Sequence, residues 1–105
     1  MNQVMNNQQP RRFFLGAPQT DKIQVYKVSN GRSGVLTQAI FSNTTEEDAR
    51  LTLTVNTIDV MKNYKVPAGE TEVINLYIVL DDGDAISLQQ DTANAVNVTL
   101  NGSVG

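Results

Sequence analysis

The sequence predicts an all-β protein, a small antiparallel β-sandwich, jelly-roll-like or Ig-like, with about seven or eight strands and an extended N-terminal arm. Short runs of alternating apolar and polar residues recur along the chain, and clusters of Gly, Asn, Asp and Pro separate them. A helix would suit only residues 46–50, where a strand fits better. A length of 105 residues favours a single domain around one thin core.

The first two strands are expected over residues 23–28 and 35–42, on either side of the turn cluster Asn30–Gly34. A third, long strand is expected over residues 50–60. Its apolar residues change face near Asn56-Thr57, which indicates either a β-bulge or a strand that crosses from one sheet to the other.

The later strands follow the same pattern. Tyr64–Val66 is expected to begin a short strand that ends at a Pro-x-Gly turn. The next strand, Glu72–Leu80, is apolar on both faces, so it is expected to be central or to be covered by another subunit. A short strand around Ile86 and Leu88 and a last strand from Val96 to Leu100 complete the sandwich.

The N-terminal 20 residues differ in composition from the rest. Residues 1–12 are rich in Asn and Gln and carry no large apolar cluster, so residues 1–20 are expected to form an extended or disordered arm and residues 21–105 the sandwich domain. The apolar cluster Phe13-Phe14-Leu15 follows the basic pair Arg11-Arg12. These residues are expected either to fill one end of the protein's own core or to bind another subunit.

Composition argues against several classes of function. The chain has no Cys and no His, which removes thiolate metal ligands and the commonest general base. Neither a Ser-x-x-Lys spacing nor a phosphate-binding loop is present, so no catalytic residues, cofactors or enzymatic activity are expected. The acidic net charge of −3 argues against nucleic-acid binding, and no apolar run suggests a membrane span or a secretory signal.

The turn Asp81-Asp82-Gly83-Asp84 is the best candidate for a metal site. Closely spaced carboxylates supply the oxygen ligands that Ca²⁺ prefers, so Asp81, Asp82 and Asp84 are a weak calcium candidate. The spacing of a full calcium loop is missing, and Asp and Gly are also ordinary turn formers. Formation of a tight turn is therefore the favoured interpretation.

A resemblance to a known group of proteins rests on turn and strand segments across residues 22–103. These segments are Ile23–Val28, Ile40–Thr44, Leu51–Val55, Val66–Thr71 (Val-Pro-Ala-Gly-Glu-Thr), Leu80–Ile86 (Leu-Asp-Asp-Gly-Asp-Ala-Ile) and Val96–Gly102. Together they resemble a small β-sandwich of tailed-bacteriophage virions. The first turn, Ser29–Gly34, departs from the Pro-Ala-Gly that is frequent in that group.

The resemblance implies a non-enzymatic virion structural protein, of the capsid decoration or head-fibre type or a tail accessory component. Such a protein is expected to be made in the host cytoplasm, to form a homo-oligomer and to bind the major capsid protein or another virion structural protein. Arg11 and Arg12 would then pair with acidic groups of the shell, and Phe13, Phe14 and Leu15 would fill an apolar pocket there. The alternative is a carbohydrate- or receptor-binding module of a tail component, which would use the loops 43–48 and 81–84 together with Tyr64 or Tyr77.

Overall fold

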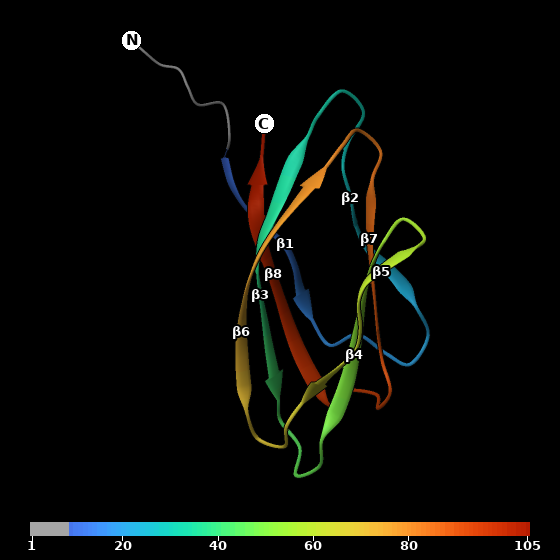
Figure 1. Ribbon diagram of the computed structural model, residues 1–105, viewed down its shortest axis with the longest axis vertical. Coiled ribbons are helices and arrows are strands. Elements are labelled where there is room, and N and C mark those ends of the chain that lie inside the picture. Colours follow the sequence, from blue (N-terminus) through green and yellow to red (C-terminus); the bar gives the residue numbers. More distant parts are fainter. Residues whose placement is uncertain (1–8) are drawn as a thin grey trace.

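A computed structural model describes residues 9–105, and over this span the chain forms two facing antiparallel sheets of four strands each (Figure 1). The strands are β1 (Gln9–Gly16), β2 (Ile23–Lys27), β3 (Gly34–Asn43), β4 (Ala49–Val55), β5 (Ile58–Val66), β6 (Thr71–Leu80), β7 (Ala85–Gln90) and β8 (Val96–Val104). The predicted small antiparallel sandwich is confirmed. No helix in the described part of the chain is long and apolar enough to cross a membrane.

The strand order is that of a jelly roll. One sheet has the order β1-β8-β3-β6 and the other has the order β2-β7-β4-β5. Strand β1 pairs with β8, β2 with β7, β3 with β6 and β4 with β5, so the first half of the chain runs antiparallel to the second half. This arrangement of eight strands in two nested Greek keys defines the jelly roll and excludes the Ig-like alternative.

The core lies between the two sheets and is built mainly from the alternating residues that the sequence pattern singled out. The largest fully buried side chains are Phe41, Leu36, Leu51, Leu53, Leu80, Ile86, Leu88, Leu100, Val28, Val66, Val96 and Val98. In β7 and β8 the buried residues alternate with less buried ones, because successive side chains of a strand point to opposite faces. Removal of these apolar side chains from water is the main force that stabilises the sandwich.

Strand β1 lies within the span predicted as an N-terminal arm. Its residues 9–16 pair with β8 along one edge of the sheet, and Phe13 joins the core. A deletion of residues 1–15 would therefore remove a strand and expose one side of β8. The predicted boundary at residue 20 does not separate an arm from the sandwich, and residues 1–8 lie outside the described residues.

The predicted long strand over residues 50–60 is wrong, because the chain turns back on itself at Asn56-Thr57. Strands β4 and β5 form a hairpin there, and Asn56 takes a left-handed backbone conformation with φ of 58°. The Asn56 amide group also holds the turn against β7, since its Oδ1 accepts a hydrogen bond from the Ala85 N–H at 3.0 Å. Asn adopts this left-handed conformation more readily than most residues. The change of face in the sequence therefore marks the turn between two strands.

One of the two interpretations of the apolar pattern of β6 placed this strand in the centre of its sheet, and that interpretation is wrong. Strand β6 is an edge strand that pairs with β3 on one side and has no described strand on the other. Its outward-facing residues are exposed and its inward-facing residues from Glu72 to Ile78 are only half-buried. The remaining explanation of the apolar pattern is that another subunit covers β6.

Candidate protein-interaction surfaces

The predicted anchor residues at the N-terminal end divide between the core and the surface. Phe13 is only 6% exposed, and its ring stacks on Tyr26 with 4.3 Å between the centroids. Phe14 is half-buried, whereas Leu15 is 59% exposed. The interpretation that this cluster fills the protein's own core is therefore confirmed for Phe13. Leu15 is left free to contact another molecule.

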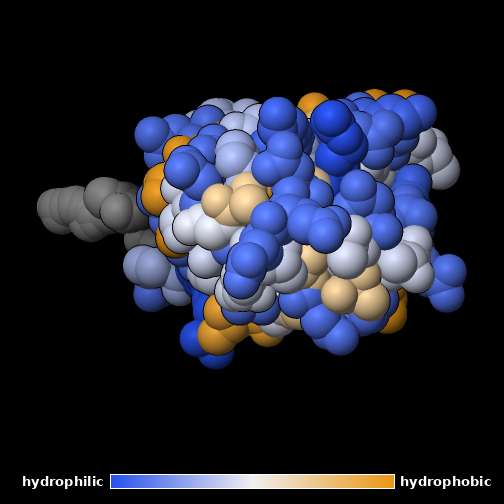
Figure 2. Space-filling model, turned by 90° about the horizontal axis from the view of Figure 1, so that it is seen from below, coloured by the Kyte–Doolittle hydropathy of each residue, from blue (hydrophilic) through white to orange (hydrophobic). Residues whose placement is uncertain are grey.

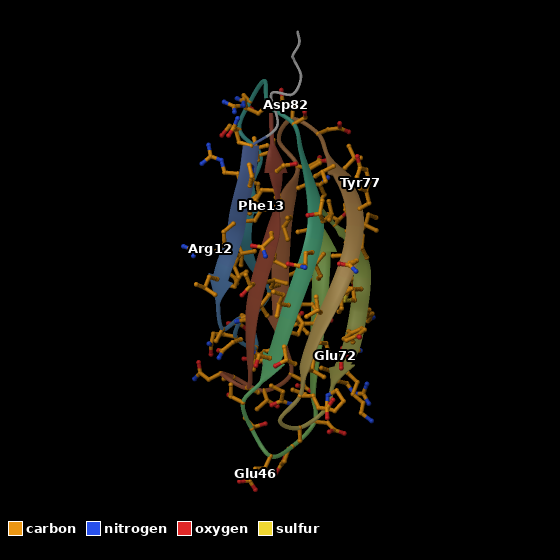
Figure 3. The ribbon with its side chains drawn as sticks, turned by 90° about the vertical axis from the view of Figure 1, so that its left-hand side faces the viewer. Arg12, Phe13, Glu46, Glu72, Tyr77 and Asp82 are labelled. Atoms are coloured by element: carbon orange, nitrogen blue, oxygen red, sulfur yellow. The ribbon has the colours of Figure 1, made fainter. Side chains whose placement is uncertain are left out.

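Arg11 and Arg12 are both exposed on β1, where Figure 3 labels Arg12, and the fold brings a third arginine to them. Arg11, Arg12 and Arg32 line one shallow hollow of about 290 Å³ together with Tyr26 and Val104. Within residues 9–105 none of the three arginines forms an ion pair. Sequence reasoning missed Arg32, because it lies in a distant turn that is tied to the C-terminal end by the Arg32 Nε hydrogen bond to the Gly105 carbonyl.

The acidic turn between β6 and β7 is a structural turn. Asp84 Oδ2 accepts a hydrogen bond from the Asp81 N–H at 2.8 Å, and its Oδ1 accepts one from Asn56 Nδ2 at 3.0 Å. The hydrogen bonds from Asn56 and from the Asp81 backbone lower the pKa of Asp84. Asp82 instead accepts from the Gly31 N–H at 2.8 Å. Among the described residues no group of three or more acidic side chains converges on a metal-binding position, which argues against the calcium candidate.

The two loops of the alternative carbohydrate-binding site lie far apart. Asp82 marks one end of the sandwich and Glu46 the opposite end (Figure 3). The end that carries Glu46 is largely hydrophilic, with hydrophobic residues gathered at its rim (Figure 2). A single ligand therefore cannot contact both loops of one chain.

The tyrosines do not share a face either. Tyr64 lies between the sheets, where its ring meets Phe41 edge-on and its hydroxyl donates to Glu72 Oε1 at 2.9 Å. This hydrogen bond raises the pKa of Tyr64. Tyr26 is stacked on Phe13, and Tyr77 points outward from β6 (Figure 3). The three rings therefore form no common platform on which a sugar could stack.

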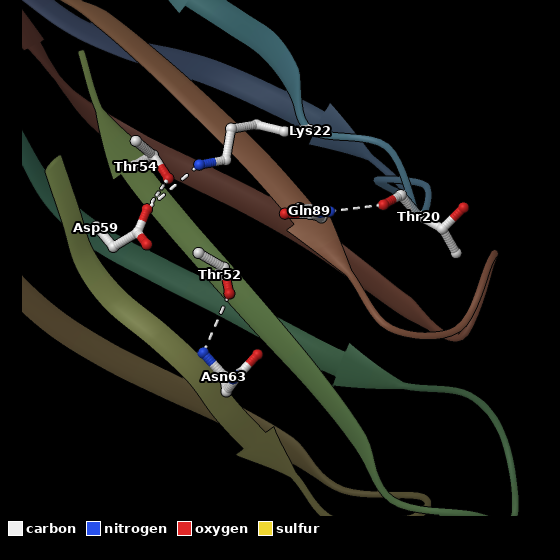
Figure 4. Close-up of polar contacts among 7 residues, drawn as sticks. All are labelled: Thr20, Lys22, Thr52, Thr54, Asp59, Asn63 and Gln89. Atoms are coloured by element: carbon white, nitrogen blue, oxygen red, sulfur yellow. Dashed lines mark hydrogen bonds and ion pairs between the residues drawn. The ribbon is translucent and has the colours of Figure 1, made fainter. Parts of the chain in front are cut away.

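The outer face of the β2-β7-β4-β5 sheet is polar, and its hydrogen bonds are largely internal (Figure 4). Asp59 Oδ1 accepts from Thr54 Oγ1 at 2.7 Å and forms an ion pair with Lys22 at 3.3 Å, which ties the two edges of this sheet together. Thr52 Oγ1 accepts from the Asn63 N–H at 3.1 Å. This network covers the buried side chains of Thr52 and Thr54. It therefore contributes to folding, because buried polar groups need hydrogen-bond partners.

The outer face at the β6 edge is apolar, in contrast. Val73, Tyr77 and Val79 of β6 are 58%, 77% and 57% exposed. The half-buried Ile40 and Val35 of β3 lie directly opposite Val73 and Val79 in the ladder. We call these five residues the β6 patch; Figure 3 shows its Tyr77 on β6, at the sheet edge opposite Arg12. The polar Asn75 lies between Val73 and Tyr77 on this face. Several exposed apolar side chains on one edge strand are nevertheless typical of a protein-binding surface.

Comparison with known proteins returns neither a matching family model nor a matching curated protein. One similar solved chain belongs to the structure of infectious bursal disease virus Gx strain, with 13% identity, a TM-score of 0.48 and cover of 92% of this chain and 28% of that chain. A second belongs to the Gt strain of the same virus, with 11% identity, a TM-score of 0.42 and cover of 96% and 30%. The chain thus spans less than a third of those chains. Both TM-scores are too low to establish a shared fold, so the architecture rests on the strand order itself.

Proposed function

We propose that this chain is a non-enzymatic structural protein of a bacteriophage virion, located on the capsid surface as a decoration or head-fibre protein. It acts by contact with other proteins: it self-associates and it binds the major capsid protein or another virion structural protein. The single observation that carries the interaction role is the β6 patch, whose three β6 side chains are all more than half exposed. A folded protein does not usually leave such a row in water unless another protein covers it.

Two further observations support the virion role. The segments across residues 22–103 resemble small virion sandwiches of tailed phages. The strand order is that of a jelly roll, an architecture that viral capsid domains use often and that lectins and cupins share. The strand order supports the virion role only by analogy with other jelly rolls, because one fold serves many functions.

The second virion protein is proposed to bind near the opposite edge of the sheet, around β1. Arg11, Arg12 and Arg32 line a hollow there, and they have no ion-pair partner among residues 9–105. Leu15 is exposed on the same strand. Unpaired arginines beside an exposed apolar side chain suit a partner with carboxylates and an apolar contact, because Arg binds carboxylates through two parallel hydrogen bonds.

The direct test is to ask whether the chain resides in particles. Phage particles purified on a density gradient from a culture that produces this protein are expected to contain the chain in many copies per particle, by quantitative mass spectrometry. The variant Arg11→Glu/Arg12→Glu is expected to leave the particle fraction, whereas the control Lys62→Glu/Lys65→Glu, on the other sheet, is expected to remain. Recovery of the wild-type chain only in the particle-free fraction would contradict the virion role.

A further inference from the structure

The β6 edge has less protection against pairing than the other sheet edges. Soluble proteins blunt their edge strands with Pro, Lys, bulges or short strands, because an open edge is a template for another strand. Strand β1 has Pro10, the exposed Arg11 and Arg12, and a register shift between Arg12 and Phe14. This edge is therefore protected in three ways.

The two edges of the other sheet are protected as well. Strand β2 has five residues, ends at Lys27, and has a register shift between Gln24 and Tyr26. Strand β5 has the exposed Lys62 and Lys65 and two register shifts in its ladder with β4. Neither edge offers a long, regular and uncharged row of backbone groups to a second chain.

Strand β6 has ten residues and carries one charged side chain, Glu72. That carboxylate is already engaged, since it accepts the hydrogen bond from the Tyr64 hydroxyl at 2.9 Å. Its ladder with β3 has one register shift, as the ladders of the other edge strands do, so length and low charge are what set this edge apart. The free side of β6 is thus the longest and least charged edge among the described strands.

Both faces of β6 carry apolar side chains that the chain itself does not fully cover. On the outer face Val73, Tyr77 and Val79 are exposed, and on the inner face Ile74, Leu76 and Ile78 are packed against the core but only half-buried. An added strand would have to be apolar on both faces to extend both rows. Strand β6 itself meets this requirement, so a second copy of the chain is a suitable occupant.

We propose that two copies of this chain pair antiparallel along β6 about a twofold axis, which joins their β1-β8-β3-β6 sheets into one continuous sheet. This deepens the self-association in the proposed function and rests on it. In the register that we propose, Val73 lies opposite Val79 of the second copy, Ile74 opposite Ile78, and Leu76 opposite its own counterpart. Such an interface is self-complementary, as a twofold dimer requires. It pairs apolar residues on both faces, except that the exposed Asn75 lies opposite Tyr77 of the second copy on the outer face.

Charge favours the antiparallel arrangement. In the proposed register Glu72 lies opposite Leu80 of the second copy, and the two Glu72 side chains lie near opposite ends of the paired strands. A parallel pairing in register would place Glu72 against Glu72, and like charges directly opposite each other are destabilising. The main-chain hydrogen bonds of the new ladder provide affinity, and the two side-chain rows provide specificity.

The first test is the solution mass of the full-length protein by light scattering over a range of concentrations. The wild type is expected to be a dimer that dissociates on dilution. The variant Val73→Lys/Val79→Lys places lysines opposite lysines in the proposed register and should weaken the dimer at least about a hundredfold. The control Ile23→Lys/Ile58→Lys changes two exposed apolar residues outside the β6 edge and should leave the dimer intact.

The second test uses the absence of cysteine from the chain. Residues directly opposite in an antiparallel pair have Cα atoms about 4.5–5.5 Å apart, within the range that a disulfide spans. The variant Leu76→Cys is therefore expected to form a covalent dimer on mild oxidation, and the control Ile58→Cys, at an exposed position of β5, is expected to remain monomeric on a denaturing gel. Crosslinking of Asn75→Cys in place of Leu76→Cys would overturn the proposed register.

The pairing itself is overturned if the wild type is monomeric at high concentration, or if the lysine variant remains a dimer with unchanged affinity. Neither result bears on the presence of the chain in particles, which the gradient experiment measures. Failure of the β6 pairing and failure of the virion role are thus separate outcomes.

Discussion

Replacing Gly102 with Ala is expected to lower the free energy of unfolding by more than about 4 kcal/mol, which would leave little soluble protein. Gly102 lies near the C-terminal end of β8, opposite Arg11 of β1 and Leu36 of β3. A Cβ atom at this position would lie 2.0 Å from the Val35 carbonyl oxygen and 2.7 Å from Phe13 Cε2. The carbonyl belongs to the β3 backbone, so the clash is relieved only if the β3–β8 ladder shifts.

The measurement is the urea midpoint of unfolding, together with the fraction of protein in the soluble lysate. Gly69→Asn is the matched control, because a Cβ atom at Gly69 would have no neighbour within 4 Å. The φ of 69° at Gly69 is one that Asn tolerates, so this variant is expected to lose no more than about 1 kcal/mol. Equal stability of the Gly102→Ala variant and wild type would contradict the close contact of β3, β8 and Phe13.

Replacing Asn43 with Ala is expected to lower the free energy of unfolding by about 2–4 kcal/mol. The Asn43 side chain is buried and makes four hydrogen bonds. Its Nδ2 donates to the carbonyls of Glu47 at 2.8 Å and Val66 at 2.9 Å, and its Oδ1 accepts from the N–H and the hydroxyl of Thr45. Loss of the amide leaves the buried Val66 carbonyl without this donor, and a buried polar group without a partner is costly.

Asn43→Asp separates shape from hydrogen bonding, because the carboxylate has the same outline but no N–H donor. It is expected to be at least as destabilising as Asn43→Ala at neutral pH, since its charge would face two carbonyl oxygens. Asn97→Ala, at an exposed position of β8, is expected to change stability by less than about 0.5 kcal/mol. Chemical denaturation of the three variants checks the order. An Asn43→Ala variant as stable as Asn97→Ala would show that the amide does not hold the turn.

Much of the fold is predictable from the alternation of side chains along single strands. The buried rows of β7 and β8 follow the period of two, because a strand places alternate residues on opposite faces. The turn around Asn56 is harder to predict, since a change of face looks the same whether a strand bulges or turns back. In the structure the left-handed conformation of Asn56 shows that the chain turns back and does not bulge. In the sequence the signal for such a turn is Asn followed by another polar residue.

Pairing between distant segments is harder still to predict. Strand β1 resembles part of an arm in the sequence, because Pro10, Arg11 and Arg12 are typical of an unpaired segment. Its partner β8 is at the other end of the chain, and no local pattern indicates that ladder. The same reason explains why sequence reasoning missed Arg32, since only the folded turn brings it to Arg11 and Arg12.

The apolar pattern of β6 is consistent with two arrangements. A strand that is apolar on both faces is either central in its own sheet or covered by another chain, and the sequence cannot separate the two. The strand order excludes the central position within the described residues. The exposure of Tyr77 and its neighbours then favours cover by a second chain.

The central claim is that this chain works by protein contact through the β6 edge, and amide hydrogen exchange of the full-length protein tests it most directly. Exchange is compared at concentrations well below and well above dimer formation. The account predicts that amides of β6 exchange more slowly at high concentration, because the added ladder engages the N–H groups on its free side. The amides of β1, at the opposite edge, are predicted to be unchanged. Exchange in β6 that is independent of concentration, or slowing confined to β1, would contradict the account.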